Sequence, residues 1–189
     1  VDAEGGIHAV YPSYAGGQSF YAYCAADCAG PEAVSVVPFD TDGTTANAML
    51  ALDGEGRPHV LLSTFQSVYY AEPSGDPKDP GSWSVARIVE HGGEREVTGE
   101  ALALDRDGHP RFMMHTYVAY LGIGQGAPET YFVGCDADCF DPGSWTSSKV
   151  ADQIWEGSAL RIDAAGTAHL ATVAHVVNED QSTTKMGAY

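Results

Sequence analysis

The chain has 189 residues, of which 44% are hydrophobic and 19% are charged, and its formal net charge is −17 at pH 7. A surface this acidic repels phosphate backbones, so we expect no nucleic-acid partner. No apolar run reaches the length of a membrane-spanning helix, and no signal peptide is recognisable, so we expect any such peptide to be absent or already removed.

A hairpin motif recurs four times along the chain. It reads Asp-x-x-Gly, followed two residues later by Ile, Pro or Ala and then by His or Arg. The copies begin at Asp2, Asp53, Asp105 and Asp163, in steps of 51, 52 and 58 residues. Alternating apolar residues flank each copy, so the motif predicts a strand, a tight turn and a second strand.

Taken in chain order, the predicted strands fall into four repeated units. They cover residues 6–13, 19–24 and 33–39; then 46–53, 57–64, 67–73 and 82–89; then 99–105, 109–116, 129–135 and 144–151; then 157–163, 167–174 and a last strand near residue 189. The pentapeptide DPGSW precedes the fourth strand of the second and third units, at 79–83 and 141–145. We expect the units to span approximately 1–39, 40–91, 92–150 and 151–189.

The four cysteines form two C-x-x-x-C pairs. In the aligned units, Cys24 and Cys135 stand where the second unit has Pro73, and Cys28 and Cys139 stand where it has Pro77. Prolines and a local disulfide both restrict a turn, whereas zinc knuckles use a different spacing. We therefore predict Cys24–Cys28 and Cys135–Cys139 disulfides, which indicate a secreted, extracellular or periplasmic protein.

Four short antiparallel strands that recur about every fifty residues predict an all-β fold of β-propeller type. Either 1–189 is a segment of a larger propeller or it closes into a four-bladed ring. The chain resembles secreted bacterial β-propeller repeat proteins of broadly sialidase-like architecture. It lacks the complete Asp-box S-x-D-x-G-x-T-W of that group, which residues 40–45, DTDGTT, match only in part.

The loops at the opposite end of the strands from the Asp-x-x-Gly turns differ between units and are where we place the candidate sites. We attribute the histidines that recur within the repeat to scaffold hydrogen bonds. Aromatic rings near carboxylates and imidazoles suit a glycan or protein ligand. The candidate ligand-binding residues on these loops are His115, Tyr117, Tyr120, Asp152, Trp155 and His175.

No cofactor follows with certainty from the sequence. Candidate metal ligands are Asp40, Asp42 and His91, and an oxygen-rich set of this kind favours calcium over copper or zinc. Against calcium, short Asp–Gly turns are common without an ion. No complete catalytic signature is present, so a binding scaffold is the preferred interpretation. The alternatives are a glycan-cleaving glycosidase or lyase, and a metal-binding or structural subunit that associates with a further propeller segment or a like chain.

Overall fold

The computed structural model describes residues 1–13, 18–90, 95–118, 128–152, 155–177 and 182–188. These residues form four antiparallel sheets, each made of strands that follow one another in the chain. The strands of the first two sheets are β1 (Ile7–Ser13), β2 (Gln18–Cys24) and β3 (Ser35–Asp40), then β4 (Thr45–Leu52), β5 (Pro58–Thr64), β6 (Ser67–Pro73) and β7 (Trp83–Glu90). Those of the last two sheets are β8 (Arg95–Leu104), β9 (Pro110–Val118), β10 (Glu129–Cys135) and β11 (Trp145–Ala151), then β12 (Trp155–Ile162), β13 (Ala168–Val177) and β14 (Thr183–Ala188).

The predicted all-β, antiparallel class is confirmed. The helical segments of the described residues are short 3-10 turns, η1 (Pro31–Ala33), η2 (Pro80–Ser82) and η4 (Pro142–Ser144). No described helix has the length and apolar character needed to cross a membrane.

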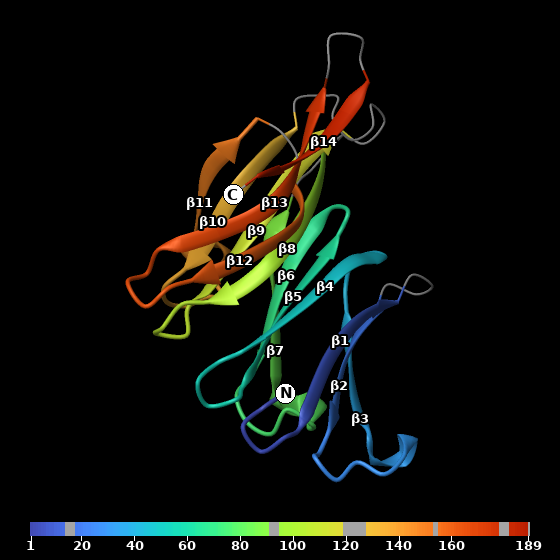
Figure 1. The fold of residues 1–189 in the computed structure, drawn as a ribbon. Helices are drawn as coiled ribbons and strands as arrows, with labels where there is room; N and C mark the ends of the chain where they lie inside the picture. Colours follow the sequence, from blue (N-terminus) through green and yellow to red (C-terminus); the bar gives the residue numbers. More distant parts are fainter. Residues whose placement is uncertain (14–17, 91–94, 119–127, 153–154, 178–181, 189) are drawn as a thin grey trace.

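The sheets follow one another in chain order, from the blue first sheet to the red fourth sheet in Figure 1. The first strands of successive sheets are in contact, β1 with β4, β4 with β8, and β8 with β12. One buried cluster joins Tyr21 and Phe39 of the first sheet to Val60 of the second, and another joins Leu61 of the second to Phe112 of the third. The core therefore lies in layers between neighbouring sheets.

The Asp-x-x-Gly turns are built alike in all four sheets. Their glycines have φ between +81° and +87°, a left-handed conformation that costs glycine little. In the second turn, Asp53 Oδ1 accepts hydrogen bonds from the backbone N–H groups of Glu55 (3.0 Å) and Arg57 (2.8 Å). The basic residue six positions after the aspartate reaches its other oxygen in the first and fourth turns, where His8 and His169 each lie 3.0 Å from Oδ2. The recurring basic position therefore serves the turn.

The predicted disulfides Cys24–Cys28 and Cys135–Cys139 are both present, with Cα–Cα distances of 5.6 and 5.8 Å. In the proline turn and in the disulfide turn alike, a backbone carbonyl accepts a hydrogen bond from the tryptophan that opens the next strand. Trp83 Nε1 donates to the carbonyl of Pro77, and Trp145 Nε1 donates to the carbonyl of Cys139, both at 2.9 Å. The two kinds of restraint therefore occupy the same positions of the repeat and present the same carbonyl to the tryptophan.

The tryptophans of the DPGSW segments pack between sheets. The ring centroid of Trp83 lies 4.9 Å from the rings of Tyr21 and Phe39, which belong to the preceding sheet. The ring centroid of Trp145 lies 5.5 Å from that of Tyr70, again in the preceding sheet. Large rings at a repeated position thus attach each of these sheets to the one before it.

Candidate functional site

The sheets have two structurally distinct ends. We call the end that carries the Asp-x-x-Gly turns the turn end, and the opposite end, where β5 ends at Thr64 and β9 ends at Val118, the loop end. The sequence-predicted ligand and metal candidates that the structure describes lie toward the loop end of their strands. Tyr120 and His91 fall outside the described residues, and Trp155 and His175 lie on β12 and β13 at positions whose side chains are not described.

At the loop end of the third sheet, charged side chains form a connected row. Glu129 accepts a hydrogen bond from Tyr131 (2.8 Å), and its carboxylate is within 3.5 Å of Arg95 and 3.4 Å of Lys149. Lys149 also pairs with Asp152, one of the candidate ligand-binding residues predicted from the sequence. The hydrogen bond from Tyr131, with Lys149 and Arg95, holds the pKa of Glu129 below its usual value.

Sequence reasoning missed Arg95, Glu129 and Lys149, which sit at the ends of strands rather than inside the loops. Tyr117, which the sequence predicts as a ligand-binding residue, is half-buried. The preceding residue is Thr116, whose hydroxyl accepts a hydrogen bond from Arg95 at 2.7 Å. The antiparallel register that places Glu129 opposite Thr116 is the signal that could have found the row. Strand pairing therefore brings Tyr117 and the charged row to one end of one sheet, but on opposite faces, because Thr116 and Tyr117 are successive residues of a strand.

His115 lies in the interior, with a side chain only 3% exposed. Its Nε2 is 3.3 Å from Glu100 Oε1, but the geometry does not make a hydrogen bond, and neither ring nitrogen has such a partner in the described part of the chain. Its depth separates it from the charged row at the surface.

Asp40 and Asp42 take up different partners. Asp40 accepts a hydrogen bond from the Gln18 amide, whereas Asp42 accepts from Ser67 (2.9 Å) and Arg87 (3.3 Å). Burial raises the pKa of Asp42, but these donors outweigh burial and the net pKa shift is downward. Their role as metal ligands, with His91, stays a prediction.

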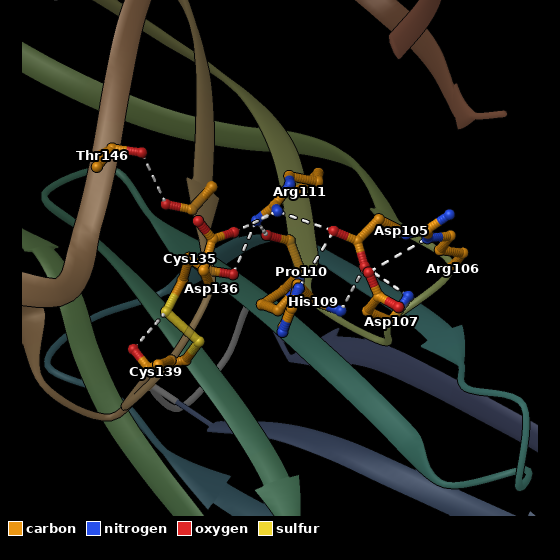
Figure 2. Close-up of polar contacts among 12 residues, drawn as sticks. Asp105, Arg106, Asp107, His109, Pro110, Arg111, Cys135, Asp136, Cys139 and Thr146 are labelled. Carbon is orange, nitrogen blue, oxygen red and sulfur yellow. Dashed lines mark hydrogen bonds and ion pairs between the residues drawn. A yellow bond between two sulfur atoms is a disulfide. The ribbon is translucent and has the colours of Figure 1, made fainter. Parts of the chain in front are cut away.

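A group with metal-ligating atoms within 4.8 Å of one another occurs instead at the turn end, formed by Asp105, Asp107 and His109. Figure 2 shows that Arg111 lies between Asp105 and Asp136, beside the Cys135–Cys139 disulfide. The backbone N–H groups of Asp107 and His109 each donate to Asp105 Oδ1 at 2.9 Å. Protein donors and a guanidinium therefore already satisfy the Asp105 carboxylate.

Two pockets lie between sheets at the turn end. The first interface pocket, of about 160 Å³, is lined by residues of the first and second sheets, among them His8, Tyr23, Asp76 and Lys78. The second interface pocket, of about 290 Å³, is lined by residues of the second and third sheets, among them His59, Tyr70, Glu72, Asp138 and Phe140. Sequence reasoning assigned this end to scaffold and named none of these residues as a ligand site.

The histidines of the two pockets belong to different hydrogen-bond networks. Tyr21 Oη lies 2.8 Å from His8 Nδ1, and the other nitrogen of His8 meets Asp2. In the second pocket, Tyr70 donates to Glu72 (2.9 Å), so His59 Nδ1–H donates to Tyr70 Oη. The equivalent aspartate, Asp53, is bound by Arg57, and its Oδ2 is 3.7 Å from His59 Nε2.

No family model, curated protein or solved structure matches this chain. Its function is therefore argued from the geometry of the two ends.

Proposed function

We propose that the chain is a β-propeller segment that acts as an extracellular binding scaffold for a glycan or a protein. Successive antiparallel sheets whose first strands touch in chain order, with apolar layers between them, support the propeller arrangement. The two disulfides support an oxidising compartment, because such bonds persist in secreted and periplasmic proteins.

The observation that carries the binding function is the charged row at the loop end of the third sheet, together with the Tyr131 ring that donates a hydrogen bond to Glu129. Carboxylates there pair with the Arg95 guanidinium and the Lys149 ammonium, and these ion pairs orient the side chains before a ligand arrives. An aromatic ring next to fixed donors and acceptors suits a sugar, which offers an apolar ring face and hydroxyl groups. It equally suits a polar protein segment.

The row favours binding over glycan cleavage. A glycosidase needs a carboxylic acid whose pKa is raised, so that it can protonate the leaving group. Glu129 has a lowered pKa, and Lys149 pairs with both Glu129 and Asp152. The Glu129 carboxylate is therefore held ionised, as suits recognition.

The test is a glycan panel and a protein-binding screen with the whole chain. Glu129→Gln should weaken binding of a panel hit by about tenfold, since a hydrogen bond to a charged group contributes about 1.5–3 kcal/mol. Val150→Ala, at an exposed β11 position, is the control that should leave affinity unchanged. Release of cleaved product would favour the enzyme alternative. Self-association without any ligand would favour the assembly alternative.

A further inference from the structure

The two interface pockets at the turn end are copies of one another that differ at matched positions. Trp83 pairs with Pro73, and Trp145 pairs with Cys135, which places the turns of the second and third sheets in one register. Asp138 of the third sheet is then the equivalent of Asp76, and Phe140 is the equivalent of Lys78. The comparison between the pockets is therefore residue by residue.

The facing wall of each pocket comes from the preceding sheet. Tyr23 and Glu72 are equivalent there, because they immediately precede Cys24 and Pro73, which occupy one position of the repeat. Each pocket thus presents one facing residue and two turn residues at matched positions.

The first interface pocket contains its own cation. Lys78 Nζ lies 5.9 Å from the centroid of the Tyr23 ring and 3.5 Å from the carboxylate of Asp76. An ammonium over a ring face and beside a carboxylate is a favourable arrangement. The three matched positions here carry one negative and one positive charge.

The second interface pocket lacks that cation. Phe140 replaces the lysine and Glu72 replaces the tyrosine, so the matched positions carry two carboxylates and no ammonium. Among the described residues no cation is paired with Asp138, which has a φ of 52°. Arg57 also lines the pocket, but its Nε is bound to Asp53 at 2.7 Å.

A second observation at this pocket concerns His59. Its side chain is 5% exposed and lines the pocket, and its Nε2 has no hydrogen-bond partner among the described residues. Burial lowers the pKa of His59, which favours the neutral ring. Its Nε2 lies 3.7 Å from Asp53 Oδ2, whereas its Nδ1 meets Tyr70, which lines the pocket with Glu72.

We propose that the second interface pocket binds the ammonium or guanidinium group of an organic cation, the group that ends lysine and arginine side chains. Glu72 and Asp138 supply the opposite charges. The rings of Tyr70 and Phe140, with centroids 5.5 Å apart, supply an apolar wall for the aliphatic stem. The site is at the opposite end of the strands from the charged row, so its test is independent of the proposed function.

The test is calorimetric titration of the whole chain with N-acetyl-lysine methylamide and N-acetyl-arginine methylamide. Both should bind saturably at one site, and the uncharged N-acetyl-norleucine methylamide should not bind. Asp138→Asn should weaken binding about tenfold, the usual effect of losing one charged hydrogen-bond partner. Asparagine also tolerates the left-handed conformation of this position.

The matched control is Asp27→Asn, which removes the same charge from the equivalent turn of the first sheet. It should leave the affinity unchanged. Equal weakening by Asp27→Asn and Asp138→Asn would mean that the acidic surface attracts cations diffusely, and it would overturn the proposal.

Phe140→Lys restores the residue that the first pocket has, so the chain should then fill the second pocket itself and binding should be lost. Circular dichroism and the melting midpoint check that the variant folds, and Asp138→Asn decides the question if it does not. Undiminished binding in a folded Phe140→Lys variant would also overturn the proposal. A pentapeptide with one central lysine distinguishes the two possible sources of the cation. Tighter binding than that of the lysine amide would indicate a protein partner, and equal binding would indicate a small amine.

Discussion

Replacing Trp145 by alanine tests whether the second and third sheets share one core. The indole donates a hydrogen bond to the carbonyl of Cys139, and its ring lies 5.5 Å from Tyr70 and 5.6 Å from Phe112. A net hydrogen bond contributes about 1 kcal/mol, and each aromatic pair adds about 0.5–1.5 kcal/mol. Since the ring is only half-buried, we expect a loss near the lower end of tryptophan truncations, about 3 kcal/mol.

The assay is urea unfolding at pH 7, followed by circular dichroism. Trp145→Phe keeps a ring in place and loses the N–H donor, so it should cost about 1 kcal/mol. Val150→Ala, on the exposed side of β11, should change stability by less than about 0.5 kcal/mol. A loss below about 1 kcal/mol for Trp145→Ala would refute the idea that this ring joins the sheets.

Three further predictions concern pH, the cysteines and the first pocket. Burial raises the pKa of Asp53 and Asp105, but backbone N–H and arginine partners outweigh it and leave both pKa values lowered. The stability that these two carboxylates contribute is therefore fully present above pH ~3.8, and it is lost as the pH falls through their lower pKa values in the folded state. The urea midpoint should therefore drop on acidification, and Asp53→Asn should make that drop smaller. Titration of the unreduced, denatured chain should detect almost no thiol; a stoichiometric signal would contradict the disulfide assignment. Lys78→Gln should leave Asp76 and the Tyr23 ring free of their cation and so create a second lysine-amide site, weaker because it has one matched carboxylate; finding no second site would argue against equivalent pockets.

The repeat could be predicted from the sequence because its turns use residues with narrow conformational roles. The glycines at 5, 56, 108 and 166 adopt the left-handed conformation, and Asp79 and Asp141 each accept a hydrogen bond from the glycine two residues later. These are local interactions, and local chemistry is what a sequence motif records. The matched positions of proline and cystine followed from the same register.

Interactions between sheets were not predictable in this way. Lys78 reaches Tyr23 across the boundary of two sheets, 55 residues apart in the chain, and no periodic pattern encodes that approach. The first strands also contain bulges, such as the shift between Glu100 and Ala103 where Ala101 has a φ of 54°. A bulge changes which residues face each side, and alternation alone had indicated regular strands.

The equivalence of prolines and cystine has a consequence for how the two pockets respond to a reductant. Asp138 lies inside the loop that Cys135 and Cys139 close, so reduction removes the covalent restraint on a residue that already occupies a left-handed conformation. Asp76 lies between Pro73 and Pro77, where no bond can be reduced. Thiol-based buffers should therefore weaken cation binding at the second pocket and leave the Lys78–Asp76 pair of the first pocket unchanged. Only the second pocket would then respond to the redox potential of its surroundings.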